Sequence, residues 1–376
     1  MSAPSRLHIG IAAVVACAAV VTGCTASGPA DRPTRHPTST AKIATAPVPG
    51  EGHGQQVPPP RRPRGRFTLA LAGDVHFEGR LASRLADNPR TVFAQAAPGL
   101  RRADLTMVNL ETAITTGSTQ QDKEFTFSAP PRALTALRDA GVDVATMANN
   151  HGADYGAAGL RDTFRAIRAR HFAVIGVGKN AAAAFAPYRT TVNGVKLAIF
   201  AADQVQDETT LSLFSAGAGN PGVANAYEPR LIRAVREAKR AGYVVVVYVH
   251  WGIEFQTCPS SDQSTLARRL AAAGASAVVG AHAHVLQGAG WLPNGSYVAY
   301  GLGNYLWWMS FGNNQDDNGV LTLSFDHSTV TRAHFAPSHL DSRGVPIPAT
   351  GAEKRRILAE WNNDRQCTTL SSRPPK

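Results

Sequence analysis

Residues 67–76 of the 376-residue chain read FTLALAGDVH, an apolar run that ends in the polar residues Asp74 and His76. The apolar part has the length of a buried β-strand. In open α/β sheets, ligands bind outside the carboxyl ends of the strands. A strand that ends directly in a carboxylate and an imidazole therefore predicts both a fold class and a ligand site.

Short apolar runs of this kind recur along the chain and alternate with helical patterns. The strand candidates are residues 67–73, 105–109, 142–147, 172–176, 197–201, 243–249, 275–280 and 297–301. The main helical candidates are residues 131–140, 156–170, 228–241 and 264–273. This alternation predicts a layered α/β fold.

Polar groups follow five of these strand candidates directly. The segments are GDVH at 73–76, NLE at 109–111, NNH at 149–151, HWG at 250–252 and GAHAH at 280–284. A single histidine after a strand is more often a hydrogen-bonded loop residue, but here five segments support each other. Their Asp, Glu, Asn and His side chains suit manganese, iron or zinc. A carboxylate bridging two ions ~3.5–4 Å apart is typical of two-metal sites.

The order D-x-H, N-L-E, N-H, H and H-x-H resembles the calcineurin-like metallophosphoesterase pattern. The strings GDVHFEGR, VNLETAIT, MANNHGADYGAAGL, VHWGIEF, GAHAHVLQG and YGLGNYLW resemble the capsule-synthesis branch of that fold, the CapA or poly-γ-glutamate capsule family. The resemblance extends from about residue 67 to about residue 323. It implies an αββα-type sandwich with metal ligands at the carboxyl ends of its strands.

The resemblance also assigns individual residues to two divalent ions. Those implied for the first ion are Asp74, His76, Glu111 and His284, and those for the second are Glu111, Asn150, His250 and His282. His151 is implied to face the substrate as general acid. Glu111 departs from the wider phosphoesterase pattern, which has Asp there and hence a shorter bridge. His76 restores the D-x-H form at a position where many capsule-type relatives carry an apolar residue.

Four neighbouring residues allow more than one interpretation. Asp154 could orient the imidazole of His151 or cap the helix that follows it. Trp307 and Trp308 fit core or rim packing better than a substrate platform. Asn304 in GLGNYL is a weaker candidate for lining the site.

The N-terminus has the layout of an export signal, since Arg6 and His8 precede an apolar stretch at residues 9–22. The stretch ends in Val-Thr-Gly-Cys24, which resembles the lipobox of bacterial lipoproteins. We therefore expect a signal peptide at 1–23 and a lipid anchor on Cys24, which would hold the protein on the outer face of the cell membrane. The alternative is an ordinary signal peptide that is cut nearby.

Residues 24–66 predict a disordered tether, because they contain nine of the 24 prolines and almost no large apolar side chains. Residues 25–66 also carry seven Lys/Arg against two acidic residues, so much of the net charge of +11 lies outside the predicted core. This distribution argues against nucleic acid as a partner, which would need a basic stripe on folded structure. The remaining apolar runs are too short for a polytopic membrane protein.

We expect one folded domain at 67–340 and a C-terminal extension at 341–376. Apart from the anchor, the exported part contains two cysteines, Cys258 and Cys367, which could pair in an oxidising compartment. Sequence does not show that they are close.

By resemblance, the protein acts in synthesis, processing or anchoring of a poly-γ-glutamate-like capsule polymer, with capsule-synthesis membrane proteins as further partners. As an enzyme it would be a metal-dependent hydrolase or transferase. Two alternatives stay open: a metal-dependent phosphoesterase of the cell envelope, and a non-catalytic subunit that binds or assembles the polymer. Fold alone does not choose among them.

Overall fold

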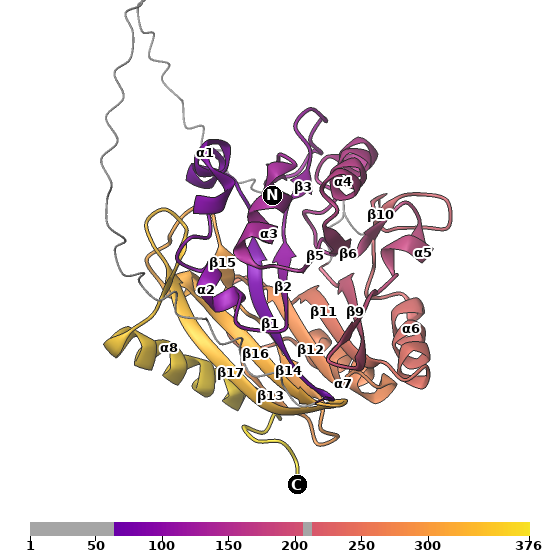
Figure 1. The fold of residues 1–376 in the computed structure, drawn as a ribbon, viewed down its shortest axis with the longest axis vertical. Coiled ribbons are helices and arrows are strands. Elements are labelled where there is room, and N and C mark those ends of the chain that lie inside the picture. The colour runs from indigo at the N-terminus through magenta and orange to yellow at the C-terminus, as the bar shows by residue number, and fades with distance from the viewer. Residues whose placement is uncertain (1–63, 206–212) are drawn as a thin grey trace, which may run out of the picture. The chain divides into compact units, whose positions relative to one another are not determined.

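The computed structural model describes residues 64–205 and 213–376. Its centre is strand β1 (Arg66–Val75), whose residues from Phe67 onward are all buried. Every strand candidate of the sequence contributes residues to a strand, and the four helical candidates form helices α3, α4, α6 and α7. Two large sheets and their covering helices make up the folded part (Figure 1).

The first sheet has eight strands in the order β18-β17-β16-β1-β2-β5-β6, with β15 paired to the end of β1. Its parallel strands are β1, β2 (Leu105–Leu110), β5 (Val144–Thr146), β6 (Ala173–Ile175) and β15 (Asn304–Leu306). Its antiparallel strands are β16 (Asp317–Asp326), β17 (Thr329–Leu340) and β18 (Pro346–Pro348). The carboxyl ends of β1, β2 and β5 therefore meet at one edge.

The second sheet has six strands in the order β13-β14-β12-β11-β9-β8. They are β8 (Tyr188–Val192), β9 (Val195–Asp203), β11 (Val244–Trp251), β12 (Ala277–His282), β13 (Ala289–Trp291) and β14 (Tyr297–Ala299). Strands β9, β11, β12 and β14 run parallel, whereas β8 and β13 are antiparallel edge strands. Short two-residue strands complete the pairing: β3 (Ala113–Ile114) with β4 (Ser128–Ala129), and β7 (Val177–Gly178) with β10 (Gly222–Val223).

Strand β11 shows why the layers stack, because both of its faces are apolar. Val244, Val246 and Tyr248 belong to the core between the two sheets, whereas the alternate residues, such as Val245 and Val247, pack toward the helices of the second sheet. Successive side chains of a strand point to opposite faces, so a continuous apolar run requires cover on both sides. The hydroxyl of Tyr248 also crosses between the sheets and donates to the carbonyl of Ala72, at 2.8 Å.

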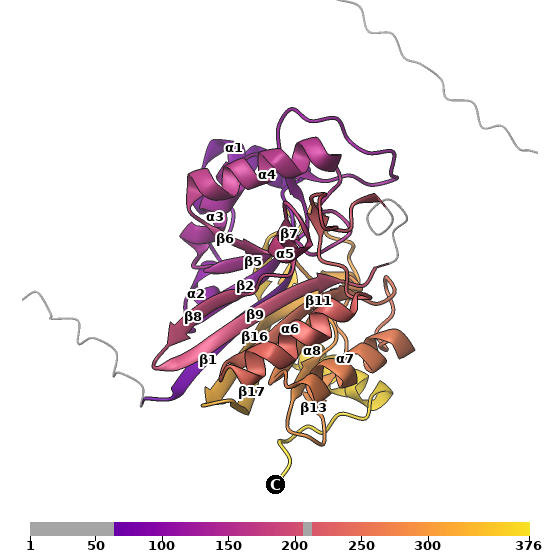
Figure 2. The same ribbon diagram turned by 90° about the vertical axis from the view of Figure 1, so that its right-hand side faces the viewer.

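Helices cover the two outer faces, as Figure 2 shows. Helices α3 (Arg132–Ala140) and α4 (Gly156–Arg170) lie on the first sheet, and α6 (Pro229–Arg240) and α7 (Ser261–Ala273) lie on the second. Ser260 and Gln263 form a capping box at the start of α7. The shorter helical segments are α1 (Arg80–Asp87), α2 (Ala97–Leu100) and α5 (Ala181–Ala184), with 3₁₀ turns at Pro89–Thr91, Asn314–Asp316 and Arg365–Cys367. This helix-sheet-sheet-helix arrangement confirms the predicted layered α/β fold class.

The C-terminal residues after 340 continue the first sheet. Strand β18 pairs with β17, and helix α8 (Gly351–Asp364) packs on β17 through Trp361, whose ring stacks on Phe335 with centroids 4.3 Å apart. A disulfide joins Cys258 to Cys367. The predicted signal peptide, Cys24 and nearly all of the tether lie outside the described residues. Among the described helices, none is long and apolar enough to cross a bilayer.

Candidate metal centre

Asp74 sits at the end of β1, where the chain passes very close to a neighbouring loop. A Cβ added at Gly73 would lie 1.9 Å from the carbonyl oxygen of Gly303, so only glycine fits there. Asp74 is fully buried, and its Oδ1 accepts from Asn109 Nδ2 at 2.8 Å. Its Oδ2 accepts from the backbone N–H of His282 and lies 3.4 Å from His284 Nδ1. Burial raises the pKa of Asp74, but the histidines and Asn109 outweigh it and lower the pKa overall.

Glu111 follows β2 and is the least satisfied group of the site. Its side chain is fully buried, and neither carboxylate oxygen has a hydrogen-bond partner in the described part of the chain. His250 Nε2 lies 3.4 Å from Oε1, and His151 Nε2 lies 4.0 Å from it. Burial, followed by repulsion from Asp74, raises the pKa of Glu111 well above its usual value. Buried carboxylates without partners are costly, and a bound cation would offset that cost.

His250 and His282 bring ring nitrogens from the second sheet toward Glu111. His250 Nε2 lies 2.9 Å from Asn150 Oδ1, and its Nδ1 lies 3.2 Å from Asn109 Nδ2. Burial lowers the pKa of His250 to about 3, although the nearby Asp74 opposes this. Burial also lowers the pKa of His282 well below its usual value, and its Nδ1 has no partner among the described residues. Both imidazoles are therefore neutral at pH 7, the form that binds metals.

The backbone is strained where the last two histidines stand. His282 has φ 96° and His284 has φ 55°, both in the left-handed region that non-glycine residues seldom adopt. Such conformations cost roughly 1–3 kcal/mol each and cluster at functional sites. The rings of His282 and His284 lie 5.7 Å apart, and the ring of His250 lies 4.7 Å from that of His282.

Three groups of side chains in the described residues have ligand atoms within 4.8 Å of one another. The first is Glu111, His250 and His282; the second is Asp74, Glu111 and His284; the third is Glu254, His282 and His284. Glu111 belongs to the first two, as expected of a bridging carboxylate. These two groups contain five of the seven predicted ligands, and a sixth, Asn150, lies beside them with its Oδ1 2.9 Å from His250 Nε2.

His76 is the predicted ligand that stands apart from these three groups. Its Nε2 accepts the backbone N–H of Trp308 at 2.9 Å. Its ring packs against Phe127 and Trp307, with centroids 4.5 and 4.2 Å away. Its Nδ1 has no partner within the described residues, and burial lowers its pKa well below the usual value. Its role as a ligand stays a prediction.

His151 is held by a group of polar side chains beside the proposed ions. Its Nδ1 lies 2.7 Å from Asp154 Oδ2, and Lys123 Nζ lies 2.8 Å from Asp154 Oδ1. Lys123 also donates to the carbonyl of Asn150 at 2.6 Å. Burial lowers the pKa of His151, while Asp154 opposes that shift. Asp154 therefore orients His151; the cap residue described for α4 is instead Tyr155, which makes no side-chain cap bond.

Sequence reasoning missed several residues that support this site. Asn109 contacts Asp74, His250 and Asn149, although only its neighbour Glu111 was singled out. Asn304, only a weaker candidate in the sequence, is buried, and its Oδ1 accepts a hydrogen bond from His284 Nδ1 at 2.9 Å. Position alone offered a signal for Asn109, which lies on β2 two residues before Glu111. Lys123 lies in none of the quoted motifs, and Glu254 lies within VHWGIEF but is not among the predicted ligands.

The family of the chain follows from a comparison of its sequence with known proteins. Residues 68–307 match the family model described as bacterial capsule synthesis protein PGA_cap. The chain belongs to this family. All of the predicted ligands, together with His151, fall inside the matched PGA_cap region, whereas β16, β17 and α8 lie outside it.

Curated relatives agree with this assignment. The PGA biosynthesis protein CapA of Bacillus subtilis is 27% identical over 304 residues, which cover 79% of this chain and 78% of the relative. The capsule biosynthesis protein CapA of Bacillus anthracis is 29% identical over 331 residues, covering 84% and 78%. The resemblance noted in the sequence to the capsule-synthesis family is thus confirmed.

Two solved structures are similar to this chain at low sequence identity. The calcineurin-like phosphoesterase YfkN of Bacillus subtilis matches with a TM-score of 0.42 and 14% identity, covering 81% of this chain and 98% of that one. The sulfate thiohydrolase SoxB of Thermus thermophilus matches with a TM-score of 0.39 and 13% identity, covering 77% and 46%.

Proposed function

We propose that this PGA_cap protein acts on a poly-γ-glutamate-like capsule polymer, in its synthesis, processing or anchoring, through a centre of two divalent ions. Family membership and the names of its CapA relatives support the polymer. The observation that supports the ions is Glu111, a fully buried carboxylate without a hydrogen-bond partner in the described chain, shared by two groups of ligand atoms.

The residues that would hold the ions fit their chemistry. Asp74, Glu111 and His284 would hold one ion, and Glu111, His250, His282 and Asn150 the other, with manganese, iron or zinc as the candidate metals. When bound, such ions polarise a carbonyl or phosphoryl oxygen and lower the pKa of water. The donor set is oxygen and imidazole nitrogen throughout, so a structural thiolate site is not involved.

The side chains around His151 support catalysis rather than binding alone. Asp154 holds Nδ1, so Nε2 points toward Glu111 at 4.0 Å and toward a substrate bound there. His151 Nε2 would give a proton to the leaving group. Burial lowers the pKa of His151, and the Asp154 carboxylate opposes this shift and so favours the protonated imidazole that this role needs. A subunit that only gripped carboxylates would have no need of a buried, oriented histidine next to its metal ligands.

The decisive experiment measures metal content and turnover in the same samples. The wild-type protein is purified without chelators, supplied with manganese, zinc or iron, and assayed on γ-glutamyl polymers and on generic phosphoesters. We expect about two ions per chain, with His250→Ala and His282→Ala losing both metal and turnover. His334→Ala is the matched control, since His334 is an exposed histidine on β17 that belongs to none of the three groups of ligand atoms.

The outcomes separate the candidate functions. Turnover of γ-glutamyl polymers supports the proposal, whereas turnover of phosphoesters alone favours an envelope phosphoesterase. Metal binding without turnover of either class favours a polymer-binding or assembly subunit. Full metal occupancy in both histidine variants would refute the dinuclear centre.

We also propose that the protein is exported and anchored through a lipid on Cys24, on the sequence pattern of residues 6–24. Several acyl chains would give the stable attachment that a single chain does not. Cys24→Ala should release the protein from the membrane fraction or leave it unprocessed. Unchanged membrane association and processing would rule out the lipid anchor.

A further inference from the structure

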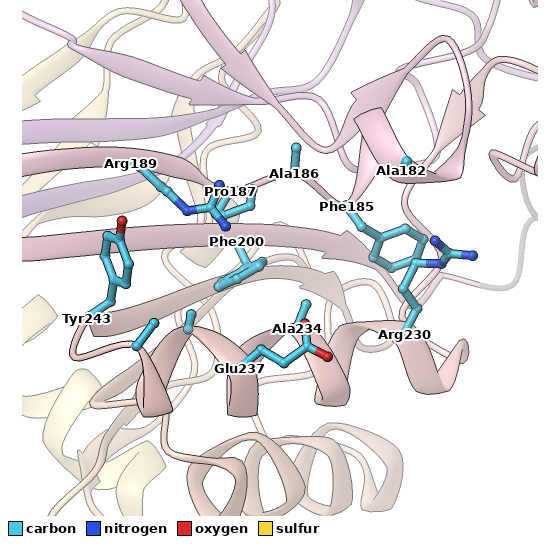
Figure 3. Close-up of a pocket in the computed structure, with 12 residues that line it drawn as sticks. Ala182, Phe185, Ala186, Pro187, Arg189, Phe200, Arg230, Ala234, Glu237 and Tyr243 are labelled. Carbon is cyan, nitrogen blue, oxygen red and sulfur yellow. The ribbon is translucent and has the colours of Figure 1, made fainter.

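A groove lies on the outer face of the second sheet, away from the metal centre. It occupies about 460 Å³ between α6 and the strands β8 and β9 (Figure 3). The buried rings of Phe185 and Phe200 line it. Figure 3 shows Arg189 and Arg230 at its two sides, with Phe200 between them. The groove thus combines an apolar floor with two cationic side chains.

A second hollow of about 490 Å³ continues this groove. The two share Ala241 and Tyr243 in their walls, and the second adds Lys196 and Lys239. Together the walls carry four Lys/Arg side chains and one carboxylate, Glu237. Two adjoining hollows with an excess of one sign of charge suit an extended anionic chain better than a compact ligand.

The two arginines of the groove are positioned by aromatic rings. The guanidinium of Arg189 lies 5.8 Å from the centroid of Tyr243, and that of Arg230 lies 5.8 Å from the centroid of Phe185. In residues 64–205 and 213–376, Arg189 has no ion pair, and Arg230 has only a 3.6 Å contact from Nε to Glu228. Planar guanidinium groups bind carboxylates through two parallel hydrogen bonds.

One end of the groove approaches the carboxyl edge of the second sheet, where His250 and His282 lie. Phe200 of β9 is paired with Val247 of β11, three residues before His250 on the same strand. At ~3.3 Å per residue, the floor of the groove lies about 10 Å from His250 along the strand direction. Arg230, at the start of α6, lies beyond Phe200 toward the same carboxyl edge of the sheet.

We propose that this groove binds an acidic polymer with regularly spaced carboxylates, and that it holds the part of the chain next to the residues at the metal centre. Arg189 and Arg230 bind successive carboxylates, while the apolar floor contacts the methylene groups between them. Glu237 opposes binding by like-charge repulsion. The inference rests on the proposed function, because it names the substrate region that the proposed reaction would use.

Fluorescence anisotropy with a labelled γ-glutamyl decamer tests the groove in the full-length protein, with metal present. Arg189→Ala and Arg230→Ala should each raise Kd about fivefold, the upper range for exposed ion pairs, and the double variant about 25-fold. Glu237→Gln should lower Kd. Arg236→Ala removes the same charge from the same helix but does not line the groove, so it should leave Kd nearly unchanged.

Each result decides something about the groove. If wild type binds the decamer and the double variant binds it equally well, the groove is not the site, and the proposed function stands. If wild type does not bind the decamer, both the groove and the proposed function fail. If a polyphosphate of equal charge binds as tightly and responds equally to both arginines, carboxylate recognition is refuted. Metal content of the arginine variants should equal that of wild type.

Discussion

Glu111 is a residue that destabilises the metal-free fold but is suited to bind a cation. The fold buries this carboxylate completely and provides no hydrogen-bond donor from the described residues. Leaving a buried group unsatisfied costs roughly 1–3 kcal/mol, and more for a charged one. Nearby Asp74 adds repulsion, which is part of why the pKa of Glu111 is raised. A cation shared with the histidines would remove both costs and keep the carboxylate ionised.

We therefore expect Glu111→Gln to separate stability from metal binding. A neutral amide costs less to bury than a carboxylate, so the free energy of unfolding of the metal-free variant should rise by about 1 kcal/mol at pH 8. Adding manganese should raise the Tm of wild type but not that of the variant. Thermal unfolding with and without metal measures both effects, and an equal metal-induced shift in the variant would exclude Glu111 as a ligand.

His151 gives a second prediction at this scale. His151→Ala should lower turnover ~10²–10⁴-fold while keeping metals and fold, least for substrates whose leaving groups need no proton. Asp154→Asn should lower turnover in part and move the basic limb of the pH profile to lower pH, because a general acid must be protonated and the Asp154 carboxylate raises the pKa of His151.

The combined variant and a control test this interpretation. His151→Ala with Asp154→Asn should be no less active than His151→Ala alone, since both changes act through one imidazole. Asp87→Asn, an exposed carboxyl on α1, should change nothing. Wild-type turnover by His151→Ala on every substrate would favour the assembly-subunit alternative.

The sequence predicted most of the ligand positions because each follows a strand with a clear apolar pattern. It could not predict Lys123, which lies in a loop and contacts Asp154. Nor could it predict Glu254, which lies in the turn after β11 and forms a group of possible ligand atoms with His282 and His284. Such contacts depend on the conformation of loops, which local sequence periodicity does not predict. For His76 the motif predicts a metal ligand, whereas in the structure its Nε2 accepts a hydrogen bond from the backbone N–H of Trp308.

At the scale of elements, the strands that lead to the proposed ligands were predicted, whereas β16, which alternates clearly between apolar and polar residues, and the irregular β17 were not. Strand β17 alternates poorly between buried and exposed positions and contains Pro337, which suits it to a position near the sheet edge. Helix α8 buries only Ile357 and Trp361, too few for a recognisable apolar stripe. Both elements are stabilised by tertiary contacts rather than by local pattern.

Helix α8 offers a pH-dependent prediction through Asp364, its last residue. Burial, followed by repulsion from Glu360, raises the pKa of Asp364 to about 6. The folded state thus favours the protonated carboxyl, so this group costs stability above pH 6 and nothing below pH ~4. Its negative charge also opposes the dipole at the helix C-terminus.

Asp364→Asn should therefore raise the free energy of unfolding by about 1 kcal/mol at pH 7.5 and by nothing measurable at pH 4, allowing for partial solvent screening. Urea unfolding at the two pH values measures the difference. Asp326→Asn serves as the control, because partners lower the pKa of Asp326 and its removal should not stabilise. Equal effects of Asp364→Asn at both pH values would contradict the assigned cause.

At the scale of the whole folded part, the metal centre depends on the packing of two sheets. Asp74, Glu111 and Asn150 lie at or after the carboxyl ends of strands of the first sheet. His250, His282 and His284 lie at or after the carboxyl ends of strands of the second. Sequence patterns predicted that all these strands end in ligands, but they did not predict which strands belong to the same sheet. The αββα arrangement came from the family resemblance, not from periodicity.

The disulfide links the C-terminal extension to the rim of this centre. Cys258 follows the turn that carries Glu254, and Cys367 lies just after α8, outside the PGA_cap region. The two cysteines are 109 residues apart, and closing a loop of that size in the unfolded chain stabilises the fold by about 4–5 kcal/mol in the chain-entropy model.

Replacing both cysteines by serine should therefore lower the urea midpoint and the free energy of unfolding by up to about 4–5 kcal/mol, because the unfolded chain regains the entropy of the open loop. A reductant should lower the midpoint of wild type to that of the double variant and leave the double variant unchanged. The single variant Cys367→Ser should lose as much, which shows that the bond, not the loss of one thiol, is responsible. Two free thiols in the unreduced wild-type domain, or a midpoint that a reductant does not move, would show that the extension is held by α8 and β18 alone.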